Sequence, residues 1–446
     1  MTRYTARRVP VHAGPAAWNA ILGPQPPAQP LEGRRTADVV IVGAGFAGLS
    51  AARRVTQLQP DAQVAIIEAG QVAEGAAGRN SGFMIDLPHD LASQDYAGAG
   101  DDRAQIQLNR QAIIFAQSAA EEYEIPADYV DPAGKVNGAA SGQGNDHNES
   151  YARHLQMLDE PCEVLDRRQM RELTGSDYYV SGLYTPGTVM LQPAGYVRGF
   201  AAGLVAQGVA LFEASAVTAI ERAGRAWRVM SQGGQIEADR VLLTVNGHLE
   251  SFGVARGRLM QLFLYAVMTP ELDDAALARL GGRSRWGITP SDPMGTTVRR
   301  IDAGQGGNRI VTRTCATLRS DARPRRSDLI RAKRVMREKF DSRFPQLAGM
   351  KMEYAWAGHL CLSRNGVAVM GEIDEGLFAG CVQNGLGTAR GTLTGIGAAE
   401  LACGATSPIT DHFTAEDQPT RLPPQPIRDI GANALLRWKE WRAAAE

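Results

Sequence analysis

Cysteine is scarce in this 446-residue sequence, and the formal net charge is only −1. The five cysteines are scattered, form no CxxC pair and are odd in number, so neither a disulfide framework nor a zinc site is predicted, and a reducing cytoplasm fits best. Near-neutral charge argues against nucleic acid or an acidic membrane as a partner, because both need a basic footprint. The densest basic run, residues 319–334, also holds acidic residues at helical spacing and is interpreted as a solvated helix face.

Long apolar segments are also missing. No run of about 18 apolar residues occurs, so no membrane span is predicted. Residues 1–20 lack the apolar core of a secretory signal. Residues 1–33, with the proline-rich stretch GPQPPAQP, are interpreted as an arm over the surface ahead of a domain. The length of the chain predicts roughly two or three domains.

A strand, turn, helix and strand follow one another near the start of the chain. Residues 37–42, ADVVIV, form an apolar, β-branched run, as expected of a strand buried on both faces. The run leads into the helical pattern GAGFAGLSAARRV and then into a second apolar strand, QVAIIEAG. This order within about 30 residues predicts a βαβ unit.

The turn of this unit carries the motif GxGxxG in Gly43, Gly45 and Gly48. The first glycine permits a tight turn, the second lets a pyrophosphate approach the backbone, and the third lets helix and strand pack closely. Glu68 ends the second strand, where its carboxylate can accept a hydrogen bond from a ribose hydroxyl. The pattern predicts a dinucleotide site, and by itself it leaves NAD and FAD open.

The stretch GAAGRNSG, residues 75–82, follows the second strand. Its small residues let the backbone lie along a cofactor that extends beyond its pyrophosphate, and Arg79 and Asn80 can donate hydrogen bonds near a flavin. The alternative is a flexible glycine-rich surface loop. A second glycine-rich segment, which begins at Gln383, matches the first one, and the pair favours FAD over NAD.

The remaining patterns set the fold class. Helices are predicted after the capping pair Asp101–Asp102 and from Pro193 to about Gly208. Residues 258–318 are rich in strand patterns and predict an antiparallel sheet, and a helix over 325–340 follows. We therefore expect an α/β chain (α+β overall), with a Rossmann-like FAD-binding domain and a discontinuous antiparallel-sheet substrate domain.

The motifs DVVIVGAGFAGLS, AIIEAG and GAAGRNSG together resemble the D-amino-acid-oxidase-type flavoproteins, and most of all the γ-glutamylputrescine oxidases and sarcosine oxidases. The resemblance continues through QPAGYVRGFAAGLVAQGV, VLLTVNG and YAVMTPEL to the C-terminal WAGHLC segment, and so covers most of the chain in order. It implies FAD, hydride transfer from a C–N bond to flavin N5, and hydrolysis of the resulting imine.

Residues predicted to bind the cofactor come from these motifs and from the resemblance. They are Gly43, Gly45, Phe46, Ala47, Gly48, Glu68, Ala69, Ala76, Gly78, Arg79, Asn80, Ser81, Gly82, Val217, Gly247, Gly358, Cys361, Asn384, Gly385, Leu386, Gly387 and Thr388. The helix that follows Thr388 can aim backbone N–H groups at the flavin pyrimidine edge. Family members usually carry GHG where this chain has Gly385-Leu386-Gly387, which puts any inherited acid–base role there in doubt. Cys361 matches the place of a covalent flavin bond in the sarcosine oxidases, and an ordinary buried thiol is the alternative.

Catalytic residues are predicted in the second domain and beside the flavin. His359 is a candidate for binding substrate or tuning the flavin, with a structural histidine as the alternative. Tyr265, with Phe263 and Trp286, is a candidate for an apolar cage around the substrate. Arg299 and Arg313 are candidates for a bidentate carboxylate contact, with solvated strand-face arginines as the alternative. No metal site is predicted.

The predicted domain organisation is discontinuous. It comprises an N-terminal arm (1–33), an FAD-binding domain (34–90, 185–258 and 350–410), a substrate domain (91–184 and 259–349), and a C-terminal strap and helix (411–446). The predicted activity is FAD-dependent oxidation of an amine or N-substituted amino acid, with O2 as acceptor.

Three alternative functions remain open at this stage: an amine dehydrogenase that passes electrons to a quinone or a partner protein, a non-catalytic flavoprotein subunit, and a NAD-dependent dehydrogenase. The missing GHG histidine keeps the subunit reading open. The two extra glycine-rich segments, which a NAD-dependent enzyme does not need, disfavour the last. The sequence leaves the amine and the oligomeric state undetermined.

Overall fold

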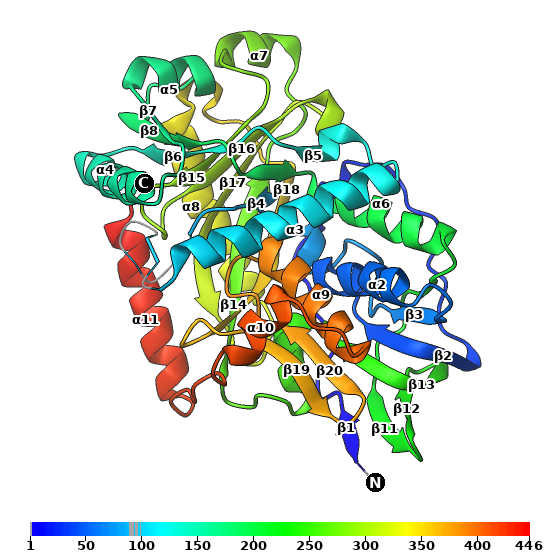
Figure 1. Cartoon of the computed structure of the whole chain (residues 1–446). Helices are drawn as coiled ribbons and strands as arrows, with labels where there is room; N and C mark the ends of the chain where they lie inside the picture. Colours follow the sequence, from blue (N-terminus) through cyan, green and yellow to red (C-terminus); the bar gives the residue numbers. More distant parts are fainter. Residues whose placement is uncertain (1, 89–92, 94–96, 99) are drawn as a thin grey trace.

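Two large sheets organise the chain, as Figure 1 shows. The computed structural model describes residues 2–88, 93, 97, 98 and 100–446. The first sheet has nine strands and a parallel core in the order β10, β3, β2, β13, β20. Its strands are β1 (Arg3–Thr5), β2 (Gly33–Val42), β3 (Val64–Ile67), β10 (Ala210–Phe212), β11 (Ala219–Ala223), β12 (Ala226–Met230), β13 (Gly234–Leu243), β19 (Val369–Asp374) and β20 (Leu377–Cys381).

The predicted βαβ unit is confirmed at the centre of this sheet. β2 pairs in parallel with β3, and α2 (Phe46–Leu58) connects them. Alternate residues of β2 point to opposite faces, and both faces are covered. Val39 and Ile41 pack among the helices, whereas Val40 and Val42 pack against the β11–β12 hairpin side. Burial on both faces is why the strand reads as a continuous apolar run.

The second sheet has eight strands in the order β18, β14, β17, β16, β15, β6, β8, β7. All neighbours are antiparallel except β15 and β6, so the predicted antiparallel sheet in residues 258–318 is confirmed. The strands are β6 (Lys135–Ala139), β7 (Glu163–Leu165), β8 (Ser181–Thr185), β14 (Leu259–Met268), β15 (Trp286–Pro290), β16 (Thr297–Ile301), β17 (Arg309–Leu318) and β18 (Tyr354–Ser363). A small third sheet contains β4 (Phe83–Met84), β9 (Val189–Leu191) and β5 (Val130–Asp131).

Helices pack on both sheets. α2 and α9 lie side by side against the first sheet (Figure 1), and the predicted caps of α3 and α6 are present: Asp101 accepts from Ala104 N, and Pro193 opens its helix. Besides α2, the helices are α1 (Ala17–Ala20), α3 (Asp102–Glu122), α4 (Gly142–Met157), α5 (Arg167–Thr174), α6 (Pro193–Ala206), α7 (Asp274–Leu280), α8 (Arg326–Arg343), α9 (Ala389–Ala402), α10 (Pro408–Ala415) and α11 (Ile427–Arg442). Across the described residues, none of the helices has both the length and the apolar character needed to cross a bilayer.

Two elements pack with a different domain from the one that the predicted residue ranges place them in. β18 lies within residues 350–410, yet it pairs with β14 in the second sheet. α3 lies within residues 91–184, yet its apolar face packs with α6 and α9 against the first sheet. The domain to which β18 or α3 belongs cannot be predicted from neighbouring residues. It depends on which distant segment of the chain packs against the apolar side of each element. The predicted boundary between residues 90 and 91 lies outside the described residues.

The N-terminal arm contacts both large sheets, although most of its described residues are exposed or partly exposed. β1 pairs with β11 in the first sheet, and Ala13 O accepts from Ala357 N at the outer edge of the second at 2.9 Å. Farther along, Trp18 is fully buried and its Nε1 donates to Asn80 O at 2.8 Å. A pattern search misses this arm because it has neither helical nor strand periodicity.

Candidate cofactor and substrate site

One cavity of about 280 Å³ collects the predicted motifs. Its wall includes the β2–α2 turn, the end of β3, the loop at residues 75–81, β14, β18 and the segment before α9. These elements come from both large sheets, so the cavity lies where the two sheets meet. The GxGxxG turn and the GAAGRNSG loop both contribute residues to its lining.

The glycine turn has the geometry that the motif predicts. Gly43 adopts φ +108°, a conformation that favours glycine. A Cβ on Gly48 would lie 1.8 Å from the Gly43 carbonyl oxygen, so only glycine lets helix and strand approach this closely. Gly45 lines the cavity, and the nearest atom to a Cβ there is Ala77 Cβ at 3.7 Å. The turn therefore presents bare backbone to the cavity.

Glu68 closes the other side of the turn. Its Oε2 accepts from Ala44 N at 2.8 Å and its Oε1 from Gly70 N at 3.1 Å. Burial raises the pKa of this carboxyl above its ordinary value, although both backbone hydrogen bonds act in the opposite direction. Glu68 is thereby fixed on the cavity wall, at the end of β3.

The GAAGRNSG loop is an ordered turn that connects three parts of the chain. Arg79 is 7% exposed, and its guanidinium donates to Glu74 O at 2.5 Å, to Gly14 O at 3.0 Å and to Ala357 O at 3.3 Å. Burial lowers the pKa of Arg79 to about 10. Asn80 Nδ2 donates to Ala77 O at 2.6 Å. Both side chains line the cavity, and both also hold the loop in shape.

Most of the residues predicted to bind the cofactor meet at this cavity. Those on its wall are Gly43, Gly45, Phe46, Ala47, Glu68, Ala69, Ala76, Arg79, Asn80, Ser81, Val217, Gly358, Gly385 and Gly387. Those that the structure places behind the wall are Gly48, Gly78, Gly82, Gly247, Cys361, Asn384, Leu386 and Thr388. The second group acts on the shape of the site: Asn384, for example, accepts from Ser363 N at 2.7 Å, and Thr388 Oγ1 donates to Phe83 O at 2.8 Å.

Cys361 is not among the residues that line the cavity, and its contact with the cofactor stays a prediction. The thiol is fully buried and packs in the apolar cluster that contains Cys381 and Leu249. Burial raises the pKa of the Cys361 thiol well above its usual range. A protonated thiol in an apolar core is what the alternative prediction, an ordinary buried cysteine without a flavin bond, describes.

His359 lies on the cavity wall among aromatic rings. Its Nε2 donates to Gln261 Oε1 at 2.8 Å, and its ring stacks on Phe263 with the centroids 5.2 Å apart. The ring of His248 meets it edge-on, also at 5.2 Å. Burial, reinforced by His248, lowers the pKa of His359 to about 3, and burial lowers that of His248 to about 4. Both imidazoles are therefore neutral at neutral pH.

Two other predicted catalytic residues are placed very differently. Tyr265 lines the cavity, and burial raises the pKa of its phenol to about 12. Arg299 lies outside the cavity: its guanidinium donates to Leu191 O at 2.6 Å and lies 5.1 Å from the Trp18 ring centroid. In this placement Arg299 ties β16 to the small sheet and the arm, and its catalytic role stays a prediction. Trp286 is likewise buried against Phe344, away from the cavity.

Several lining residues were not among those predicted from the sequence. Residues 8–12 of the arm lie on the wall, and Arg8 Nη1 donates to Ser320 O at 2.8 Å. Residues 244–246 line the cavity directly before Gly247, within a motif that the resemblance covered. Asn246 Oδ1 and His248 Nδ1 are buried and have no hydrogen-bond partner among the described residues. Unpaired buried polar atoms on a cavity wall fit the binding of a polar ligand.

Comparison with known proteins identifies the family. The model of the DAO family, FAD dependent oxidoreductase, matches residues 38–401. The chain belongs to this family and is an FAD-dependent oxidoreductase. The glycine cradle at Gly43–Gly48, the fixed Glu68 carboxylate and the unpaired Asn246 oxygen are compatible with an FAD that runs along the cavity.

Similar proteins support the same family. The chain is 25% identical to a probable oxidoreductase OrdL of Haemophilus influenzae, over 84% of this chain and 85% of that protein. It is 24% identical to the γ-glutamylputrescine oxidoreductase of Escherichia coli, over 77% and 78%. The fold matches glycine oxidase from Geobacillus kaustophilus with a TM-score of 0.68 at 18% identity, over 87% of this chain and all of that one.

The two neutral histidines predict a loss of stability in mild acid. Their pKa values in the folded protein lie below the ordinary value, so the unfolded chain takes up protons first as the pH falls. The stability present above about pH 6.5 is expected to decline through about pH 4, with His359 accounting for about 1–2 kcal/mol at about pH 5. Urea unfolding of the wild type and of His359→Gln between neutral pH and about pH 5 measures this loss of stability. Equal pH slopes in the two proteins would contradict the prediction.

Proposed function

We propose that this protein oxidises the carbon–nitrogen bond of an amine that also carries a carboxylate, such as an amino acid or an N-substituted amino acid. The charge of the cavity wall carries the proposal. Among the described lining residues Glu68 is the only carboxylate, whereas Arg8, Arg79 and Arg313 contribute guanidinium groups. A wall of this sign favours an anionic substrate as well as the cofactor's phosphates. Relatives named for γ-glutamylputrescine and glycine support the class of substrate.

Arg313 is the residue we assign to the substrate carboxylate. It lies on β17, pairs with Ala266 of β14 in the strand register, and is half-buried on the wall. Leu264 and Tyr265 of the neighbouring strand supply an apolar surface next to it. A guanidinium can bind a carboxylate through two parallel hydrogen bonds and so orient the substrate, which leaves the amine end free to face the cofactor.

Bound FAD supplies the two-electron acceptor for a hydride from the substrate α-carbon. The substrate enters as the neutral amine, its nitrogen lone pair assists as the hydride leaves, and the imine formed is hydrolysed by water to a carbonyl compound and an amine or ammonia. Dioxygen is the proposed final acceptor, which gives hydrogen peroxide. The chain itself needs to orient the substrate and exclude water. Neither His359 nor Tyr265 is proposed as a base, because an imidazole with a pKa of about 3 binds a proton too weakly and a phenol with a pKa of about 12 keeps its own proton.

Anaerobic mixing of the FAD-loaded protein with a panel of amines tests the proposal. The panel contains glycine, sarcosine, proline and γ-glutamylputrescine, with putrescine as the amine that lacks a carboxylate. Loss of the flavin absorbance band is expected with at least one carboxylate-bearing amine, and not with putrescine. Bleaching by putrescine alone would overturn the assignment of an anionic substrate, and reoxidation by a quinone but not by air would replace dioxygen as the acceptor.

Arg313→Leu is expected to raise the substrate concentration that half-bleaches the flavin by about 100-fold, because one bidentate charged pair is lost. Arg7→Leu is the matched control, since Arg7 is an exposed residue outside the cavity. The rate of bleaching at saturating substrate is expected to fall much less than the affinity. An unchanged half-bleaching concentration in Arg313→Leu would remove this residue from the substrate site.

A further inference from the structure

The C-terminal helix α11 turns its apolar side to solvent and its polar side to the protein, which is the reverse of an ordinary surface helix. Its large apolar residues point to solvent, and their exposed fractions are high: Ile427 69%, Ile430 68%, Leu435 52%, Trp438 48% and Trp441 73%. Their spacing of three to five residues places them along one side of the helix, and we call them the outer stripe. Exposed apolar residues that form a contiguous stripe, rather than being scattered singly, mark an interaction surface.

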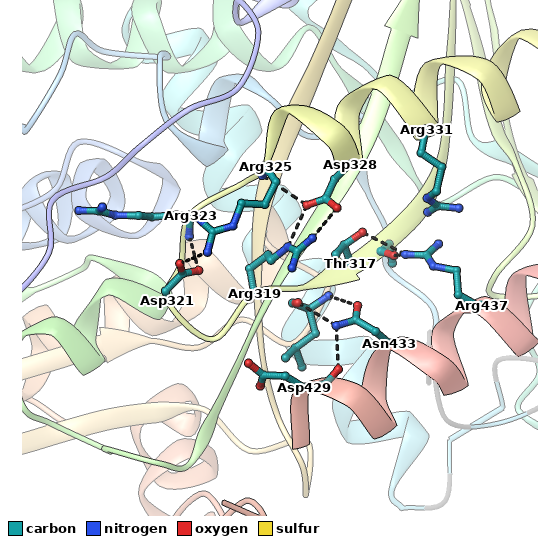
Figure 2. Close-up of polar contacts among 12 residues, drawn as sticks. Thr317, Arg319, Asp321, Arg323, Arg325, Asp328, Arg331, Asp429, Asn433 and Arg437 are labelled. Carbon is teal, nitrogen blue, oxygen red and sulfur yellow. Dashed lines mark hydrogen bonds and ion pairs between the residues drawn. The ribbon is translucent and has the colours of Figure 1, made fainter. Parts of the chain in front are cut away.

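The opposite, polar side of α11 is bonded to the edge of β17 (Figure 2). Asn433 accepts from Leu318 N at 3.0 Å and donates to Leu318 O at 3.1 Å. Arg437 donates to Ala316 O at 2.6 Å, and Glu440 accepts from Ala316 N at 2.9 Å. These side chains take the place of a neighbouring strand, because they satisfy both backbone groups of alternate residues.

The polar side faces inward because this part of β17 has a free edge. β16 pairs only with residues 309–313 of β17, so residues 314–318 are left for α11. Ser320 Oγ also donates to Asp429 at 2.5 Å, and the terminal Glu446 accepts from Ser291 Oγ at 2.9 Å. Turning the helix to bury the outer stripe would break all of these contacts. The exposure of the stripe is therefore fixed by the fold.

The segment that contains α8, the helix beside α11, is rich in basic residues. Residues 319–343 hold ten arginines and lysines but four aspartates and glutamates, although the whole chain has a net charge of −1. This segment contains α8, which lies beside α11 through the Arg331–Glu440 ion pair at 3.0 Å. Arg326, Lys333 and Arg334 are exposed on α8 and form no ion pair with any described residue. These exposed side chains agree with the predicted solvated helix face, and their excess of positive charge is hidden in the near-neutral total of the chain.

Arginines and tryptophans also meet within the stripe itself. The guanidinium carbon of Arg442 lies 5.0 Å from the Trp438 ring centroid. Ile330, between the exposed basic residues Arg326 and Lys333 of α8, is 59% exposed. In Figure 2, Arg323 extends away from the network of polar contacts around Arg319 and Asp328. An apolar and a basic side chain are therefore in contact on α11 itself, beside a helix that carries exposed basic residues.

We propose that this face docks the protein onto the surface of an anionic lipid bilayer. Tryptophans favour the boundary between headgroups and acyl chains, a stripe of apolar residues can insert to that depth, and flanking arginines and lysines bind the negative headgroups. A second copy of the chain fits less well, because a two-fold contact through α11 brings the two basic α8 surfaces together. The helix lies flat on the lipid surface and does not cross it.

Sedimentation with vesicles tests the proposal on the full-length, FAD-loaded protein. Binding is expected to vesicles of phosphatidylcholine mixed with phosphatidylglycerol, and to fall by at least about tenfold on pure phosphatidylcholine or in high salt. Trp438→Ser combined with Trp441→Ser is expected to lower the partition coefficient on mixed vesicles by about tenfold or more. Tryptophan emission of the wild type is expected to shift to the blue on binding.

Matched control variants distinguish binding through this surface from non-specific adsorption to vesicles. Val164 is 61% exposed on β7, outside α11, so Val164→Ser is expected to leave binding unchanged. Arg326→Gln with Arg334→Gln is expected to weaken binding to mixed vesicles without changing the size of the free protein. Failure of the wild type to bind mixed vesicles at low salt would overturn the proposal. So would a dimer by light scattering that dissociates in the double tryptophan variant, since the occupant would then be a second copy.

Discussion

Gly48→Ala is expected to destroy FAD binding and to lower the free energy of unfolding by about 3 kcal/mol or more, because overpacking against backbone cannot relax cheaply. The added Cβ would lie 1.8 Å from Gly43 O and 2.8 Å from Thr244 Oγ1. Relief requires α2 to move away from β2, and this movement deforms the turn that lines the cavity. Urea unfolding of the cofactor-free protein gives the loss of stability, and flavin retained after gel filtration gives the loss of binding.

Gly45→Ala separates the two effects. Its Cβ has no neighbour closer than 3.7 Å, so the cofactor-free fold is expected to keep its stability. Because Gly45 lines the cavity, the methyl group takes space that the motif reserves for the pyrophosphate, and FAD affinity is expected to fall by about tenfold or more. If both variants lost stability equally and kept FAD, the turn would be structural only.

Arg79→Leu is expected to lower the free energy of unfolding by about 3 kcal/mol or more, since buried carbonyls lose a charged donor. The guanidinium joins Glu74 O, Gly14 O and Ala357 O, which belong to the loop, the arm and β18. The arm is therefore expected to detach locally, and FAD to leave faster. Limited proteolysis of the arm and the rate of flavin release measure the two consequences.

Arg7→Leu is the control for this change. Arg7 lies in the same arm, is exposed, and its side chain forms no recorded hydrogen bond with the described residues. It is expected to unfold and to retain flavin as the wild type does. Cleavage of the arm at equal rates in Arg79→Leu and Arg7→Leu would show that the guanidinium does not hold the arm in place.

Local patterns in the sequence predicted the elements whose contacts are local. The β2–α2–β3 unit, the Asp101 cap and the start of α6 at Pro193 each follow from neighbouring residues. The Gly43, Gly45 and Glu68 positions followed from the same pattern, because the spacing of a turn is a local property. This part of the cavity wall could be located before any tertiary contact was known.

The rest of the site depends on distant pairings. Arg299 and Arg313 occupy adjacent strands, and no local pattern distinguishes one arginine from the other. Trp18 of the arm covers Arg299, whereas Arg313 stays on the cavity wall, and an irregular arm has no periodicity from which this could be predicted. The same limit applies to α11. The sequence shows which side of this helix is apolar, but the usual expectation would be that this side is buried. Because the free edge of β17 binds the polar side of α11, the apolar side faces solvent instead.

The N-terminal arm also has a consequence for the order of assembly. Its residues are synthesised first, yet its partners Glu221 and Ala357 are far along the chain, so the arm cannot dock until most of the protein has been made. Residues 8–12 then complete the cavity wall. Until the arm docks, the cavity lacks the part of its wall that residues 8–12 supply.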